Sequence, residues 1–221
     1  MALPHGVGEH RGAVVIDFTL SQLVMRACAV LLVSALQGWA LSAAACALGD
    51  AGPKHDGRLT IDPLRHVDML GGLVALFFAI GWGKWVAIDP RVLRRGRFDL
   101  LLVVFAGFAA VVLGVLALRF ARPFLLPLLP DTAAATAFAL IQTIIELGLW
   151  FALLGLLPLP PLSGGHLLVA VIPKLRDRLP GIELFLGLIL AALVTSGVAT
   201  RALDPAFRFL MVWVLGEEVG M

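Results

Sequence analysis

Four long apolar runs constrain this chain more than any other feature. Residues 99–118 and 132–157 form the two clearest runs, and residues 20–48 and 182–200 form two more. A helix needs about 20 apolar residues to cross the hydrocarbon core of a bilayer. Inside that core every backbone polar group must be satisfied within the protein, which restricts spanning segments to helices and closed barrels. The runs therefore predict a polytopic, predominantly helical membrane protein.

The composition supports a membrane protein and excludes other classes. Hydrophobic residues make up 60% of the 221 residues and charged residues 14%, whereas a soluble domain has about 45–50% and about 25%. So few charges could not cover the surface of a soluble globule, and a disordered chain needs the opposite balance. The net charge of +2 carries no signal for nucleic-acid binding. We expect an all-α polytopic membrane protein with five or six membrane segments, in contact with the lipid bilayer and with no nucleic-acid partner.

The chain divides into three parts by composition. Residues 1–19 form a polar N-terminal segment without the apolar stretch of a signal peptide, residues 20–175 a membrane core, and residues 176–221 C-terminal membrane segments. Basic residues are more frequent in the cytoplasmic loops of membrane proteins. The order of the runs places nine basic residues on one side and five on the other: Arg11, Lys84, Arg91, Arg94, Arg95, Arg97, Lys174, Arg176 and Arg178 against Lys54, Arg58, Arg65, Arg119 and Arg122. This count predicts a cytoplasmic N-terminus.

Three stretches within the apolar sequence do not fit a full-length helix. Residues 69–82 are short for a complete span and are predicted to form a half-span or a tilted helix. Residues 82–90 look extended, and their tryptophans suit a membrane–water interface. Residues 157–166 contain three prolines and two glycines, which cannot sit in a regular helix. Irregular backbone at membrane depth is tolerated only where protein or a cavity satisfies it, so a site is expected there.

Three segments, in this order, resemble the site-2 protease family of intramembrane zinc metalloproteases. Residues 57–68, GRLTIDPLRHVD, are similar to the GRLTLNPxxHID stretch of the compact bacterial branch without PDZ or CBS domains. Residues 81–90, GWGKWVAIDP, are similar to the family's FGWAKPVxVNP, and residues 157–165, LPLPPLSGG, to its NLLPIPPLDGG. The likeness covers roughly residues 30–172. It implies a site-2 protease-like transmembrane core with short extended or re-entrant segments, in the inner membrane of a bacterium.

In that family a zinc ion is held by two histidines of an HExxH motif. The spacing of four places both histidines on one helix face, and the glutamate beside the first acts as general base. An aspartate from the LDG segment completes the ligand set, and the metal lowers the pKa of a bound water.

Every one of those chemical positions is changed in this chain. The HExxH register falls on residues 37–41, where Gln37 and Leu41 replace the histidines and Gly38 replaces the glutamate. Ser163 stands in the place of the aspartate, and Gly155 in that of an asparagine before the proline run. Leucine cannot bind zinc, and glutamine and serine are poor ligands for it. The resemblance therefore implies the fold and argues against hydrolysis, with no cofactor expected.

Three other polar residues are candidates for a replacement site. Glu146 lies inside an apolar run, where a carboxylate is costly and points to function. His66 lies in the first family-like segment, and His166 directly follows the third. The structural alternatives are that Glu146 pairs with an arginine or packs against the proline–glycine segment, and that Gln37 and Ser163 hydrogen-bond to each other or to a water.

These observations predict a pseudoprotease that binds another membrane protein, as a regulator or as an accessory subunit. The alternative is a divergent but active metalloprotease that holds zinc through replaced ligands. No small-molecule substrate is predicted. A cleft for an extended partner segment is expected at seven residues: Trp82, Trp85, Ile88, Pro158, Pro160, Pro161 and Gly164. Zinc binding is predicted to return when the family residues are restored together: Gln37→His, Gly38→Glu, Leu41→His and Ser163→Asp.

Overall fold

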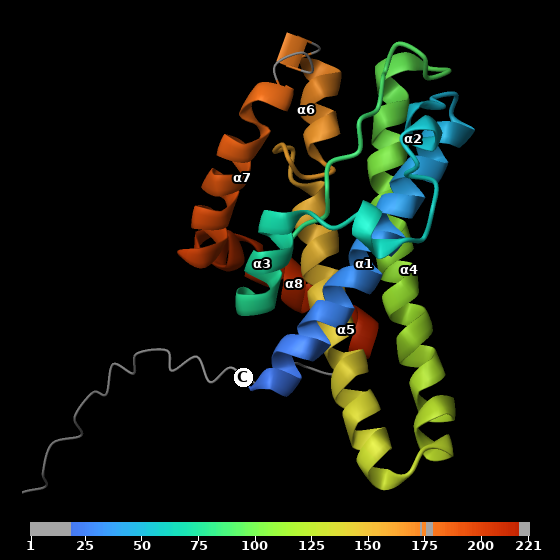
Figure 1. The fold of residues 1–221 in the computed structure, drawn as a ribbon, viewed down its shortest axis with the longest axis vertical. Helices are drawn as coiled ribbons and strands as arrows, with labels where there is room; N and C mark the ends of the chain where they lie inside the picture. The colour runs from blue at the N-terminus through green and yellow to red at the C-terminus, as the bar shows by residue number, and fades with distance from the viewer. Residues whose placement is uncertain (1–18, 173, 176–178, 217–221) are drawn as a thin grey trace, which may run out of the picture.

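Three long helices form the centre of the computed structural model, which describes residues 19–172, 174–175 and 179–216. They are α1 (Leu20–Ala47), α4 (Asp99–Leu125) and α5 (Asp131–Leu156), and each is long and apolar enough to cross a membrane. α4 and α5 form an antiparallel hairpin, and α1 leans across it (Figure 1). The prediction of an all-α polytopic membrane protein is confirmed.

Prolines set the ends of the two hairpin helices. α4 gives way to the short 3-10 helix η3 (Leu126–Leu128), and Pro130 directly precedes α5. At its other end α5 stops before Leu157, whose backbone is extended because Pro158 follows. The proline–glycine segment therefore begins where the hairpin ends.

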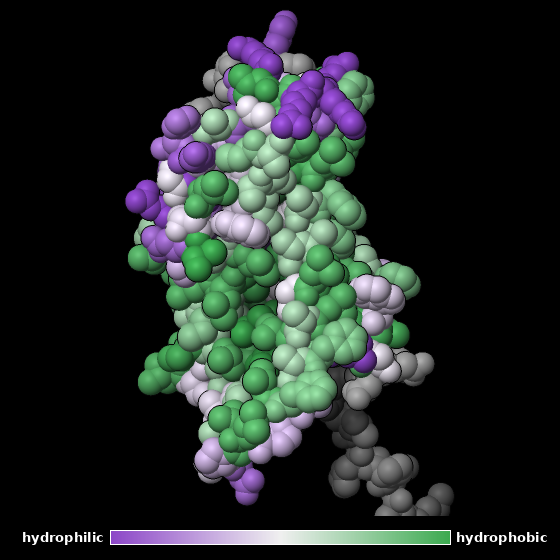
Figure 2. Space-filling model, turned by 90° about the vertical axis from the view of Figure 1, so that its right-hand side faces the viewer, coloured by the Kyte–Doolittle hydropathy of each residue, from purple (hydrophilic) through white to green (hydrophobic). Residues whose placement is uncertain are grey.

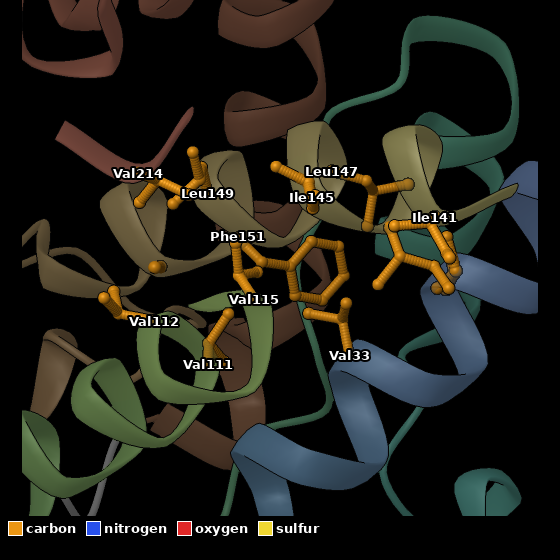
Figure 3. Close-up of a cluster of buried hydrophobic side chains, with 14 of the residues drawn as sticks. Val33, Val111, Val112, Val115, Ile141, Ile145, Leu147, Leu149, Phe151 and Val214 are labelled. Atoms are coloured by element: carbon orange, nitrogen blue, oxygen red, sulfur yellow. The ribbon is translucent and has the colours of Figure 1, made fainter. Parts of the chain in front are cut away.

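A cluster of buried apolar side chains holds the three helices together. Valines of α1 and α4 meet isoleucine, leucine and phenylalanine side chains of α5, with the Phe151 ring among them (Figure 3). Gly148 allows a close approach of α4, because a β-carbon there would lie 2.9 Å from Val115 Cγ2. In a membrane such close packing drives helix association, since lipid tails are as apolar as the side chains.

α3 (Met69–Phe78) is an apolar helix of only 10 residues, which is too short for a complete span, as the sequence indicated. The Asp68 carboxylate accepts a hydrogen bond from Gly71 N at 2.7 Å and caps its start. Its end turns through Ala79, which has a left-handed backbone. Arg26 of α1 donates to the carbonyls of Leu76 and Phe77 at 2.9 and 3.0 Å, so the last turn stays satisfied inside the protein.

Shorter elements surround the ends of α1 and α5. They are α2 (Gly52–His55), the 3-10 helices η1 (Pro63–Arg65) and η2 (Gly96–Phe98), and α6 (Gly165–Val171). Residues 80–89 are extended, as predicted, and pair through an isolated bridge between Val67 and Gly83. The buried Arg58 holds this segment, because its guanidinium donates to the carbonyls of Arg65, Lys84 and Trp85.

The C-terminal part consists of α7 (Leu179–Thr195) and α8 (Val198–Leu215). The two helices are bent by 69° around Gly197, whose φ of 76° suits glycine. If this bent pair is one span, the described residues hold four spans, and otherwise three. The five or six membrane segments expected from the sequence included segments shorter than a full span, and α3 is such a segment.

Several basic loops lie together at one end of the molecule. Asp50 Oδ2 accepts a hydrogen bond from Asp89 N at 2.7 Å, and Arg94 N donates to Leu48 O at 2.9 Å. Hydrophilic side chains gather at this end, above a broad hydrophobic surface (Figure 2). The sequence count placed Arg58 and Lys84 on opposite sides of the membrane, which is wrong, because α3 does not carry the chain across.

Candidate functional site

The four positions of the altered metalloprotease motif line one small cavity. It lies between α1, the extended segment, the end of α5 and the proline–glycine segment, and it has a volume of about 20 Å³, room for about one water molecule. Among the lining residues are Gln37, Gly38, Leu41 and Ser163. The family register therefore places residues from two distant segments around a common space.

Gln37 and Ser163 meet beside Gly155 but do not complete a polar pair. The Ser163 hydroxyl donates to the Gly155 carbonyl at 2.9 Å. A β-carbon at Gly155 would lie 2.8 Å from Gln37 Nε2 and 2.9 Å from Ser163 Oγ, so glycine makes room for both side chains. Gln37 Nε2 is buried without a hydrogen-bond partner. A water in the cavity would satisfy this amide, as the sequence analysis anticipated as one possibility.

Leu41 stands at the position of the family's second histidine and packs in the apolar core. Its side chain fills a hollow at Gly107 of α4, where a β-carbon would lie 2.8 Å from Leu41 Cδ2. It belongs to a buried cluster that includes Val86 and Ile88. Ile88 is 4% exposed, so it serves this cluster and not an open cleft.

The His66 ring lies against Gly38, which stands at the position of the family's general base. A β-carbon at Gly38 would overlap His66 Nδ1 and lie 2.7 Å from its Cγ. The ring is fixed because Nε2 bonds to the Thr60 carbonyl at 2.7 Å, which makes Nε2 the protonated nitrogen. Burial lowers the pKa of His66 and outweighs the opposing effect of that hydrogen bond, so the ring is neutral at pH 7 and Nδ1 keeps a free lone pair.

His166 is the second buried imidazole at the cavity. Its ring stacks on Trp85 with 4.0 Å between centroids, and it hydrogen-bonds to the backbone of Val86. Nε2 is buried without a partner, and so is the indole Nε1 of Trp82. The cavity is thus surrounded by unpartnered nitrogen atoms from several elements.

The proline–glycine segment closes tightly against its neighbours. A β-carbon at Gly165 would lie 2.8 Å from Pro160 N, and one at Gly164 would lie 2.7 Å from the Leu156 backbone. Pro160 and Gly164 are buried, whereas Pro158 is exposed. Of the seven residues expected at a partner-binding cleft, three line the cavity: Trp82, Trp85 and Pro161.

Glu146 lies apart from the two histidines with which it was grouped. His66 and His166 line the cavity, but Glu146 does not. It is exposed on the outer surface of α5 and accepts a hydrogen bond from Gln142 Nε2 at 3.0 Å. The structure therefore brings together two of the three residues proposed for a replacement polar site.

The residues at the cavity do not fit the zinc site of the family. The family-like positions offer an amide, an alkyl group and a hydroxyl that is already hydrogen-bonded to Gly155. No group of three or more histidine, cysteine or acidic side chains able to hold a metal occurs in residues 19–172, 174–175 and 179–216. Zinc sites in enzymes take three protein ligands of those types.

Arg58 and Gly107 shape this site, although neither was among the candidate residues expected from the sequence. Arg58 fixes the extended segment that carries Trp82 and Trp85, and Gly107 receives Leu41. Arg58 belongs to the family-like GRLT segment, so the sequence could have drawn attention to it. Its burial beside the extended segment, which the structure shows, indicates that it binds the backbone. Gly107 sits in an apolar run, and nothing in the sequence marks it.

Comparison with known proteins points to the same class of protein. Over 165 residues the chain is 29% identical to a protein of Bacillus subtilis (strain 168) named putative zinc metalloprotease YwhC. The similarity covers 71% of this chain and 74% of that protein. No protein-family model matches the chain, and no solved structure matches it. This chain is therefore similar to a bacterial protein named as a metalloprotease, which fits a site-2 protease-like family.

Proposed function

We propose that this chain is a noncatalytic relative of intramembrane zinc metalloproteases that acts by binding another membrane protein, as a regulator or an accessory subunit. The observation that carries the proposal is the lining of the cavity: the family-like positions hold Gln37, Gly38, Leu41 and Ser163, and none of them is a histidine, an aspartate or a glutamate. The packing of Leu41 into α4 supports it, because a ligand position has become part of the core.

Binding would take place along the extended segment of residues 80–89. Lys84 and Ala87 are exposed there, and the neighbouring Trp85 is partly exposed. The family to which the chain is similar binds its substrates as extended strands beside the active site. An extended partner segment placed along residues 80–89 would use the same mode, with backbone hydrogen bonds for affinity and side-chain pockets for specificity.

The protein would lie in the bacterial inner membrane with its basic end in the cytoplasm. The predicted cytoplasmic N-terminus depended on placing Arg58 and Lys84 on opposite sides, whereas the structure joins them. Exposed basic residues at that end include Lys54, Arg91, Arg94, Arg95 and Arg97. By the positive-inside rule this end is cytoplasmic, and the start of α1 at Leu20 then lies on the opposite side.

Zinc content tests the loss of catalysis, and crosslinking tests binding. Protein purified from membranes without added metal should contain close to no zinc, and it should not cleave a single-span substrate. A photocrosslinking residue at Ala87 should capture a protein segment, whereas one at Phe105, which is 62% exposed on α4, should capture lipid. About one zinc per chain, or lipid alone at Ala87, would contradict the proposal.

The alternative function is a divergent metalloprotease, and the two histidines favour it. Both imidazoles have one nitrogen held by backbone and a second that is buried without a partner, an arrangement found around many metal ligands. Under this alternative, substrate cleavage would stop on addition of a zinc chelator. Cleavage would also fall on replacement of His66 by glutamine or His166 by asparagine, since each variant keeps one N–H donor but lacks the free nitrogen.

A further inference from the structure

Glu146 lies on the outer surface of α5 within a membrane-spanning helix. α5 has 26 residues, and the hydrocarbon core takes about 20. Any stretch of about 20 residues within Asp131–Leu156 includes position 146. The side chain therefore lies at hydrocarbon depth wherever α5 sits along the membrane normal. It is exposed and not enclosed by the bundle.

This exposure is unusual for an ionisable residue in a membrane helix. Such residues almost always face the bundle interior or a water-filled cavity, and they pair with other groups. Glu146 accepts one hydrogen bond, at Oε1, from the amide of Gln142 one turn earlier. A carboxylate has about four positions for hydrogen bonds. The Gln142 amide fills only one of these positions, and the lipid around α5 offers no hydrogen-bond donors for the others.

The face that carries Glu146 is shaped to receive a second helix. Four residues share it at helical spacing: Ala135, Ala139, Gln142 and Glu146. Small residues such as the two alanines let another backbone approach closely. Beyond Glu146 the helix is covered, because Trp150 stacks on Phe207 of α8 with 4.3 Å between ring centroids. The open part of the face therefore lies between α8 and the Asp131 end of the helix.

We propose that this face of α5, formed by Ala135, Ala139, Gln142 and Glu146, binds a transmembrane helix of a partner protein that carries an arginine or lysine at the depth of Glu146. A basic side chain complements the carboxylate and removes it from contact with lipid. A second copy of this chain fits less well, because it would bring a second carboxylate to the same depth. The inference names a surface distinct from the extended segment and does not depend on the loss of catalysis.

Photocrosslinking in native membranes tests this surface. A photoreactive residue at Ala139 should capture a membrane-spanning peptide that contains arginine or lysine, whereas one at Phe105 on α4 should capture lipid. Glu146→Gln and Glu146→Lys should each lower the yield from Ala139 more than about tenfold, as expected when one partner of a buried charge pair is removed. Asp131→Asn is the matched control, because it neutralises an exposed carboxylate at the end of the same helix and should leave the yield unchanged.

Charge reversal completes the test. In the Glu146→Lys protein, replacement of the captured partner's basic residue by glutamate should restore the yield. Capture of lipid alone at Ala139, capture of a second copy of this chain, or a yield unaffected by both Glu146 variants would overturn the proposal. Crosslinks from Ala87 should be unaffected by Glu146→Lys, so failure at α5 and failure at the extended segment are told apart.

Discussion

The His66 ring lies over the Cα of Gly38 on α1, so closely that a β-carbon at position 38 would come within 2.7 Å of His66 Cγ. The ring cannot turn aside without giving up the bond between Nε2 and the Thr60 carbonyl. The side chain that fills the position of the general base thus comes from another family-like segment. In this chain the absence of a side chain at position 38 and the placement of the His66 ring are one packing arrangement.

The first prediction concerns Gly38 itself. We expect Gly38→Ala to destabilise the protein by about 1–3 kcal/mol, the usual cost of overpacking a buried site. Gly181→Ala is the matched control, because nothing lies within 4 Å of a β-carbon there. Thermal unfolding midpoints in mild detergent give the comparison. Equal midpoints for the two variants would show that His66 does not occupy this space.

The second prediction concerns restoration of the motif. We expected from the sequence that Gln37→His, Gly38→Glu, Leu41→His and Ser163→Asp together restore zinc binding. In this structure a glutamate at position 38 would meet the His66 ring, which predicts the opposite result. We expect the fourfold variant to unfold at a lower temperature than the parent and to hold close to no zinc. Adding His66→Ala should recover part of the lost stability. The zinc content per chain and the melting temperature of each variant check these two expectations. One zinc per chain in the fourfold variant would show that the His66 ring does not prevent zinc binding.

The third prediction concerns pH. Burial lowers the pKa of His66 below its ordinary 6.5. Below that pH the unfolded chain therefore binds more protons than the folded chain. The stability that the neutral ring supplies is complete above about pH 6.5 and is lost as the pH falls toward the lowered pKa, by at most about 1.4 kcal/mol per pH unit. In His66→Gln, which keeps a donor for Thr60, the loss of melting temperature between pH 7.5 and pH 5.5 should be smaller than in the parent.

The fold could be predicted from the sequence to a large extent, because its main signals are local. Apolar runs and prolines give the start of α4 and both ends of α5 to within one residue, whereas α4 continues past the predicted end at Leu118 to Leu125, with Pro123 inside the helix. The half-span α3 was visible as a run too short to cross. The count of basic residues did not take into account that so short a helix leaves the chain on the side from which it entered, which puts Arg58 beside Lys84. Which basic residues share a side therefore depends on this single element.

The alignment with the family-like segments predicted which residues stand at the motif positions of the candidate site, but not how they pack. That register places Gln37, Gly38, Leu41 and Ser163 around one cavity. It does not reveal that His66 fills the space at Gly38, because this contact joins residues 28 positions apart through the fold. The direction in which Glu146 points was equally hidden, since periodicity within an almost wholly apolar helix does not separate an outward face from an inward one.

The fourth prediction concerns Arg58, which satisfies backbone carbonyls at Arg65, Lys84 and Trp85. We expect Arg58→Met, which keeps an unbranched side chain without the N–H groups, to cost about 3 kcal/mol, because three partly buried carbonyls lose their charged donor. Arg65→Met is the control, because Arg65 is exposed and pairs with Asp62 only at 4.0 Å. Limited proteolysis should cut residues 80–90 in the Arg58 variant first. Equal protease resistance of the two variants would mean that the extended segment is held by other contacts.

The fifth prediction concerns membrane orientation, because the structure gathers the basic loops at one end. Alkaline phosphatase is active only outside the cytoplasm, so it reports the side on which a fusion ends. We expect a fusion after Leu129, in the turn between α4 and α5, to be active, and a fusion after Arg95 to be inactive. The physical reason is the excess of arginine and lysine beside Arg95 and the presence of only Arg119 and Arg122 near the α4–α5 turn. The reverse pattern would place the cavity toward the outer side of the membrane and would restore the cytoplasmic N-terminus that the count of basic residues predicted.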